Sequence, residues 1–249
     1  ATSLQKFGSG TWILTGNNTY TGQTIIGKGN NKGTLQIGNG STTGSICNSS
    51  EIINECILRF KRSDTCTYNG IISGNGILFQ SGTGTLILTS DNNYTTQTTV
   101  ERGSLIISGS LTSVNPLKVA SGASLGGDGS CLSRVVIDSG GSVFPGVTVP
   151  GKLSVDSIFM SKGSVITFDV GALSDTLVLA GEGIHTLEGT VNIRKTAGFG
   201  SGTYRIINYA GTLKSALNIG VSPDGYRCSL SAGTGYINVI VTSDSSLPP

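Results

Sequence analysis

The chain has 249 residues, of which 38 are glycine and only 12% are charged, and its formal net charge is +2. This composition has no collagen period and too little charge for a coiled coil or a charged disordered tail. Lysine and arginine are dispersed apart from one short run, so we expect no nucleic-acid partner. No apolar run approaches the roughly 18 residues of a membrane-spanning helix, and Ala1 does not begin a signal peptide. We therefore expect a mature fragment that does not insert into a membrane.

Short alternating strands bounded by Gly, Asn, Ser or Asp recur along the whole chain. In chain order they include residues 11–15, 85–89, 104–107, 164–170 and 236–241. These runs are rich in Thr, Val, Ile and Leu, which favour strands. No window shows the 3.6-residue apolar spacing of an amphipathic helix. The sequence predicts an all-β fold and a single domain over residues 1–249.

One segment of the sequence occurs twice. Residues 8–29 align without a gap to residues 82–103, and both copies continue into a further strand, at 33–37 and 103–107. Three short strands per turn with glycine at the corners predict a right-handed parallel β-helix, with Leu14 and Leu88 filling an interior column. A flat β-sandwich is the alternative, but its strands would be joined mainly by tight hairpins. The long repeat favours the solenoid.

The repeat carries a family resemblance. The pattern G-x-G-T-L-x-L-T-G-x-N-T-Y-T-G-x-T-x-V resembles the passenger-associated transport repeat of autotransporters, here at residues 8–26 and 82–100. The downstream half, 121–249, is similar to the family at 121–130, 135–146, 162–170, 174–178 and 202–209. The resemblance implies a parallel β-helix that a Gram-negative bacterium exports to its surface or releases. We expect a monomeric passenger without the family's translocator barrel.

The stretch Asp138-Ser139-Gly140-Gly141 looks like the nucleophile loop of a trypsin-like serine protease. The chain's one histidine, His185, follows the serine, whereas the trypsin-like order places histidine and aspartate before it. Ser139 is not set in a G-x-S-x-G elbow between a strand and a helix, and no helix is evident. We therefore expect a turn between two strands, and the family resemblance places a β-helix corner there.

Residues 41–70 depart from the family pattern, and we expect them to form an inserted loop that contains Cys47, Cys56 and Cys66. An oxidising destination favours a disulfide, either Cys56–Cys66 or Cys47–Cys66. Closing a loop of about ten residues would stabilise the fold by roughly 2.5 to 3 kcal/mol. Zinc is the less favoured alternative, because the spacings and the lack of a nearby histidine fit no finger or ribbon. We expect Cys131 to be buried as a small apolar residue.

The same segment holds the one compact basic run, Arg59, Phe60, Lys61 and Arg62, which is our candidate partner-binding site. Arginine and aromatic residues are enriched in interface hot spots. The alternative is a solvated strand end whose side chains cover the coil beneath. The pairs Asn17-Asn18 and Asn92-Asn93 are interpreted as turns or stacked amide ladders.

No catalytic, metal-binding or cofactor-binding residue is predicted. The densest acidic set is Asp156, Asp169 and Asp175, which we interpret as solvent-facing rather than as a glycosidase or lyase site. Residues 126–129 resemble a calcium-binding nonapeptide, but a single copy cannot build the stacked ion ladder. His185 is expected to be a surface or hydrogen-bonded histidine.

The sequence predicts a secreted, non-enzymatic virulence factor that contacts host molecules. One hypothesis is a soluble ligand of a host cell-surface receptor, similar to the pro-angiogenic, mitogenic autotransporters that act on an endothelial growth-factor receptor. The alternative is an adhesin or self-associating biofilm passenger that attaches to cells or extracellular matrix through uncapped ends or Thr- and Asn-rich ladders. An enzyme that acts on glycans is a distant third.

Overall fold

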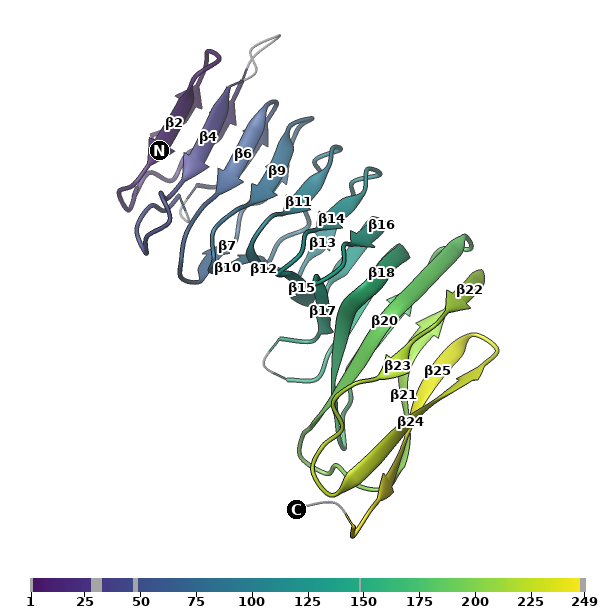
Figure 1. Ribbon diagram of the computed structural model, residues 1–249. Helices are drawn as coiled ribbons and strands as arrows, with labels where there is room; N and C mark the ends of the chain where they lie inside the picture. The colour runs from purple at the N-terminus through teal and green to yellow at the C-terminus, as the bar shows by residue number, and fades with distance from the viewer. Residues whose placement is uncertain (1, 28–32, 47–48, 148, 247–249) are drawn as a thin grey trace.

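The computed structural model describes residues 2–27, 33–46, 49–147 and 149–246 and shows a solenoid of stacked β-strands (Figure 1). Within these residues the secondary structure is entirely β, and no helix has the length and apolarity needed to cross a membrane. Strands of successive coils pair in parallel, so the predicted parallel β-helix is confirmed and the sandwich alternative is wrong.

Three parallel sheets run along the solenoid. The first sheet consists of β2 (Thr11–Leu14), β4 (Thr34–Ile37), β6 (Ile57–Phe60), β9 (Ile77–Gln80), β11 (Thr98–Val100), β14 (Leu117–Val119), parts of β16 (Ser130–Ile137), β18 (Lys152–Val170) and β20 (Ile184–Lys195), and β22 (Thr212–Ser215). The second sheet consists of β7 (Cys66–Tyr68), β10 (Thr85–Leu88), β12 (Gly103–Ile107), β15 (Ala123–Gly127), β17 (Ser142–Pro145), further parts of β18 and β20, and β23 (Asn218–Ile219).

The third sheet contains β1 (Leu4–Lys6), β3 (Thr24–Ile26), β5 (Glu51–Asn54) and β8 (Ile71–Ser73). Asn92 continues it, because its side chain accepts a hydrogen bond from Ile72 N at 2.9 Å and its backbone bridges to Leu111. From there the sheet passes through β13 (Ser110–Leu111), parts of β16 and β18, β19 (Thr176–Leu179) and β21 (Gly202–Tyr209). Asn92 is 0% exposed and belongs to this sheet, so its interpretation as a turn residue is wrong.

Strand alternation builds the core. Leu35, Leu58 and Leu78 lie in register on the first sheet and are each 0% exposed. The residues that flank each leucine along its own strand face outward. One side chain in two therefore enters the interior, as the pleat of a strand requires. The stacked apolar columns stabilise each coil against its neighbours, since no single coil can bury its own apolar side.

The two copies of the repeat lie on different sheets. Leu14 stacks on Ile37 in the first sheet, whereas its equivalent Leu88 stacks on Tyr68 and Ile107 in the second. The prediction that both leucines fill one interior column is therefore wrong. From Leu14 the chain completes three coils, to Gln80, and then crosses to the next side of the solenoid before it reaches Leu88. The intervening coils differ in length, so the two copies start on different sheets.

The segment 41–70, expected as an inserted loop, contributes regular coil strands. In it, β5 pairs with β3 and β8, β6 pairs with β4 and β9, and β7 pairs with β10. Inward residues Ile52, Leu58 and Tyr68 are at most 1% exposed. Alternation of buried and exposed residues, rather than the family motif, fixes these strands, so the loop prediction is wrong for the described part of the segment.

The third sheet ends in an antiparallel hairpin. Strands β24 (Tyr226–Gly233) and β25 (Tyr236–Ser243) pair with each other, and β25 pairs antiparallel with β21. A change from parallel to antiparallel pairing interrupts the stacking direction of the coils. The antiparallel pairing ends the third sheet, whereas β22 and β23 end the other two sheets with one edge unpaired among the described strands, so the role of uncapped ends stays a prediction.

Candidate binding surface

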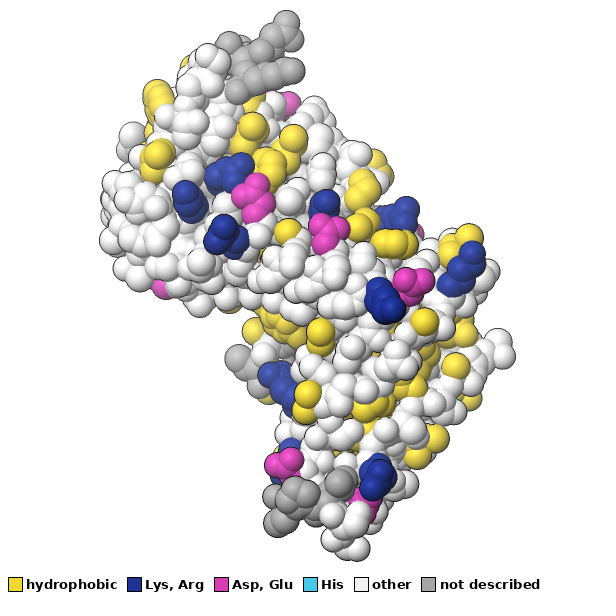
Figure 2. Space-filling view, viewed as in Figure 1, with side chains coloured by type: hydrophobic (Ala, Val, Ile, Leu, Met, Phe, Trp, Pro, Cys, Tyr) yellow, Lys and Arg dark blue, Asp and Glu magenta, His cyan; other side chains and the backbone are white. Residues whose placement is uncertain are grey.

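The outward side of the first sheet presents one residue per strand in a continuous register. We call this row the outer column; its members are Ile13, Gln36, Arg59, Phe79, Thr99, Lys118, Val136, Phe159, Thr186 and Lys214. Figure 2 shows hydrophobic side chains interspersed with basic and acidic ones on one side of the solenoid. The outer column is a mixed apolar and cationic surface rather than a purely polar exterior, and Gln36 is its one buried member.

Two arginines of the first sheet lie over phenylalanines of the outer column. The guanidinium carbon of Arg59 is 4.3 Å from the ring centroid of Phe79, and that of Arg134 is 5.5 Å from the centroid of Phe159. Each ring attracts the cation through the negative charge of its face. Both phenylalanines remain half-buried, so part of each ring is open to a partner.

Ion pairs hold two cations of the outer column, Arg59 and Lys118, in place. Arg59 Nη1 donates to Ser81 Oγ at 2.5 Å and to Glu101 Oε2 at 2.7 Å, and Ser81 Oγ donates to the same carboxylate oxygen at 2.6 Å. Lys118 Nζ lies 3.2 Å from Asp138 Oδ2. These contacts link strands of successive coils and hold the side chains in defined positions.

The four residues predicted to bind a partner do not form one surface. Phe60 is 1% exposed and belongs to the core, whereas Lys61 is exposed. Arg62 donates to the Asp64 carboxylate at 2.9 and 2.8 Å and to Thr42 O at 2.6 Å, and it also contacts Gly44 O. Strand alternation turns Phe60 inward, so its predicted role as a partner contact is wrong. Binding through Arg59 and Lys61 stays a prediction.

The cysteine predictions have different outcomes. Cys47 lies outside the described residues, and Cys56 and Cys66 are both buried among core residues. The disulfide involving them stays a prediction. Cys131 is 1% exposed, which confirms its expected burial, and its Sγ lies 3.2 Å from Ser133 Oγ. Burial raises the pKa of the Cys131 thiol, which disfavours the reactive thiolate.

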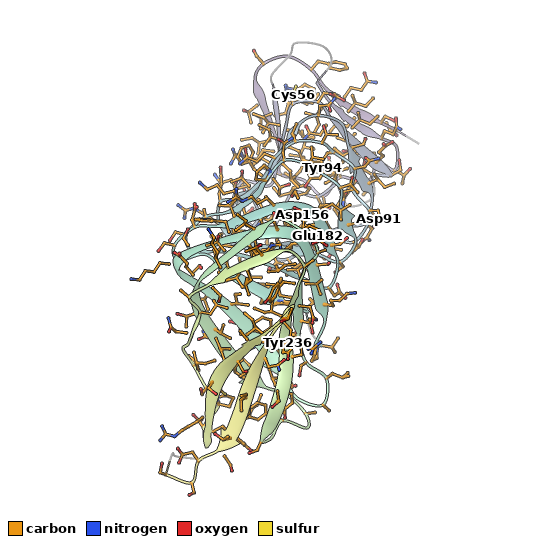
Figure 3. All side chains as sticks on the ribbon, turned by 90° about the vertical axis from the view of Figure 1, so that its right-hand side faces the viewer. Cys56, Asp91, Tyr94, Asp156, Glu182 and Tyr236 are labelled. Atoms are coloured by element: carbon orange, nitrogen blue, oxygen red, sulfur yellow. The ribbon has the colours of Figure 1, made fainter. Side chains whose placement is uncertain are left out.

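The three aspartates have three different environments. Asp175 is 1% exposed, so its expected solvent-facing position is wrong. It accepts hydrogen bonds from Gly151 N at 2.9 Å and from Asp169 N at 2.7 Å, and burial raises its pKa to about 6. Asp169 forms a bidentate pair with Arg194 at 2.6 and 2.9 Å. Asp156 is exposed at another corner, beside Glu182 of the next coil (Figure 3).

His185 lies in strand β20, whereas Ser139 lies in a turn. His185 is 0% exposed, so a surface position is wrong; its Nε2 is 3.0 Å from Gly181 O and 2.9 Å from Ala210 O. Its Nδ1 has no hydrogen-bond partner among the described residues. Ser139 is exposed in a turn that Gly141 N closes on Asp138 O at 2.9 Å, with Gly140 at φ +79°. The predicted turn at a β-helix corner is confirmed. No group of three or more His, Cys, Asp or Glu side chains in the described ranges is arranged to hold a metal ion.

The stacked parallel strands and the repeated segment define a repeat protein of the parallel β-solenoid class. Residues 4–30 and 78–107 match the passenger-associated-transport-repeat family. The chain is also 41% identical over 250 residues to the Adhesin BmaC autotransporter of Brucella suis biovar 1 (strain 1330), an alignment that covers 96% of this chain and 7% of that protein. The chain is autotransporter passenger sequence with passenger-associated transport repeats, as its own repeat predicted. Such a passenger is secreted to the bacterial cell surface or the extracellular space.

Proposed function

We propose that this chain is an adhesive section of its passenger, which contacts a host cell surface or extracellular matrix through the outer column. The observation that carries the proposal is the unbroken register from Ile13 to Lys214. At about 4.8 Å per strand the column extends for roughly 45 Å. The similarity to a protein named as an adhesin supports this choice.

The chemistry of the outer column suits protein or glycan contacts that are weak singly and strong together. Arginine and aromatic side chains dominate interface hot spots. Arg59 is held by Glu101 and Ser81, so it loses less conformational freedom on binding than a free side chain. Repetition along one axis lets several contacts form at once, which raises overall affinity.

The proposed role is non-enzymatic and needs no cofactor. The chain's one histidine is buried with its Nε2 directed at two backbone carbonyls, a structural use of the side chain. Asp175 likewise binds backbone amides. We propose that the chain acts as a monomer, since the antiparallel pairing of β25 ends the parallel stacking of the third sheet.

The soluble receptor-ligand hypothesis is the second candidate, and it loses its predicted surface. Its candidate surface was the run from Arg59 to Arg62. Arg59 and Phe60 instead end strand β6, with Phe60 in the core, and Lys61 and Arg62 follow the strand. Action on an endothelial growth-factor receptor therefore stays a prediction without a dedicated patch, and we favour the adhesive role.

The test measures binding of the purified chain to cultured host cells and to immobilised extracellular matrix. The test variant is Phe79→Ala with Phe159→Ala, and the matched control is Ile25→Ala with Ile53→Ala, two half-buried outward residues in register on the third sheet. Circular dichroism and urea unfolding verify that both are folded. We expect the test variant to lose at least tenfold in binding and the control to stay within about twofold.

Equal losses in both variants, or no loss in either, would refute the outer column as the contact surface. Receptor phosphorylation is recorded in the same cells. Phosphorylation by the soluble chain without adhesion would replace the adhesive role with the receptor-ligand hypothesis.

A further inference from the structure

Two adjoining hollows lie at the corner where the first sheet passes into the second. One has a volume of about 340 Å³ and is lined by Gly40, Lys61, Ser81, Gly82, Thr83 and Arg102. The other, of about 450 Å³, is lined by Thr83, Glu101, Arg102, Gly103, Ser121 and Gly122. Because they share Thr83 and Arg102, they form one groove along the solenoid axis, which we call the corner groove.

Glycines at the base of the corner groove leave its backbone uncovered by side chains. A side chain on Gly82 would overlap the carbonyl oxygen of Arg62, and one on Gly103 would overlap that of Gly84 in the preceding coil. Gly103 also has φ +60°, a conformation that other residues rarely adopt. The coils thus stack too closely for any side chain at these positions, and a ligand can approach the backbone.

The uncompensated charge in the corner groove is positive. Glu101 accepts hydrogen bonds from both Arg59 and Ser81, so its charge is already neutralised. Lys61 and Arg102 are exposed, and neither has an ion pair among the residues that the structure describes. The groove therefore offers two available cations and no available anion.

The spacing of these cations suits a chain-like ligand. Phe60, Gln80 and Val100 lie in register. Lys61, which follows Phe60, and Arg102, which lies two residues after Val100, are therefore two coils apart. Two steps of about 4.8 Å place their backbones roughly 10 Å apart along the axis. The exposed residues Thr83 and Ser121 add hydroxyl groups to the same lining.

We propose that the corner groove binds an acidic glycan. Its sulfate or carboxylate groups pair with Lys61 and Arg102, and its hydroxyl groups bond to Thr83 and Ser121. Arginine suits both anions because its planar guanidinium donates two parallel hydrogen bonds. The inference rests on the proposed adhesive function, for which it supplies a ligand class.

Other polyanions fit the corner groove less well. None of its lining residues is aromatic, and single-stranded nucleic acids need rings on which bases stack. An acidic peptide that adds a strand needs open backbone amides. At this corner Gly82 N donates to Phe60 O and Gly84 N donates to Arg62 O, so those amides are occupied.

The test passes the purified chain over immobilised heparin, polysialic acid, neutral dextran and single-stranded DNA. The test variant is Lys61→Ala with Arg102→Ala. The control is Lys152→Ala with Lys195→Ala, which removes the same charge from two other exposed side chains outside the outer column. We expect binding to heparin, polysialic acid or both, weakened at least tenfold in the test variant and less than about twofold in the control. Heparin alone would identify sulfate as the group bound, and polysialic acid alone would identify carboxylate.

Equal weakening in the two variants would show attraction to net charge and overturn the inference, as would equal binding to dextran or to DNA. Cell adhesion is measured before and after enzymatic removal of glycosaminoglycans and sialic acids. Adhesion without glycan binding would overturn the groove assignment and leave the adhesive function standing. Glycan binding without adhesion would do the reverse.

Discussion

The hydroxyl group of Tyr94 lies 2.5 Å from Thr98 Oγ1 inside the solenoid, and Tyr20 and Thr24 make the same contact at 2.7 Å in the first copy of the repeat. Tyr94 is 1% exposed, whereas Tyr20 is half-buried. Burial raises the pKa of both phenols, so both remain neutral at physiological pH. The repeat thus encodes a hydrogen bond that allows a tyrosine to enter the core.

Replacing Tyr94 by Phe should destabilise the chain more than replacing Tyr20 by Phe. The first change leaves Thr98 Oγ1 buried without the tyrosine hydroxyl, at a cost of about 1 to 2 kcal/mol. In Tyr20→Phe, partial exposure lets water replace the lost partner, and Thr24 Oγ1 also lies 2.9 Å from Ser49 Oγ. The midpoint of urea unfolding measures both variants. Equal shifts in the two would contradict the argument from burial.

Gly126 should resist substitution because of Phe144. The Phe144 ring lies where a side chain on Gly126 would be, and the two residues are in register on the second sheet. Gly126→Ala is therefore expected to cost about 1 to 3 kcal/mol by forcing the ring away. Adding Phe144→Ala should recover part of that loss, since the overlap is then removed.

A double-mutant cycle on urea-unfolding free energies measures this coupling. We expect Gly126→Ala and Phe144→Ala to be non-additive by about 1 kcal/mol. Additive effects would mean that the ring does not set the size limit at Gly126.

The sequence predicts the solenoid because the alternation of apolar and polar residues specifies the strands and the repeated segment indicates stacked coils. It could not predict which sheet each copy joins. The residues in register with Leu14, namely Ile37, Phe60 and Gln80, are separated by 23, 23 and 20 positions, so the coil length changes between the copies. For the same reason the pairing of Arg59 with Phe79 and Glu101 is not visible in the sequence. Segment 41–70 lacks the family motif but still forms coils, because the alternation of apolar and polar residues is enough to pair its strands.

Phe60 and Lys61, neighbours in the sequence, should respond oppositely to truncation. Phe60→Ala removes a core ring and is expected to cost about 3 to 5 kcal/mol. Lys61→Ala changes an exposed side chain and should stay within about 0.5 kcal/mol. Thermal and urea unfolding distinguish these outcomes. A small effect of Phe60→Ala would restore the loop prediction.

Because of Asp175, the stability of the folded chain should fall as the pH rises from about 4 to about 6. Its pKa is raised from the ordinary 3.8 to about 6, chiefly because burial disfavours the charged form. The folded chain therefore holds this proton more tightly than the unfolded chain does. The resulting stabilisation is fully present below the unfolded pKa and is lost as the pH rises through the folded one.

The variant Asp175→Asn should remove this slope while lowering stability overall. Both carboxylate oxygens accept backbone N–H groups, from Gly151 and Asp169, so one amide hydrogen-bond donor of asparagine must face another donor. Leaving that buried group unsatisfied costs about 1 to 3 kcal/mol. Urea unfolding at pH 4, 5, 6 and 7 measures the slope, with Asp156→Asn as the exposed control that should retain it. If Asp175→Asn kept the wild-type slope, another group would have to titrate in this range, and the buried carboxyl would not be the cause.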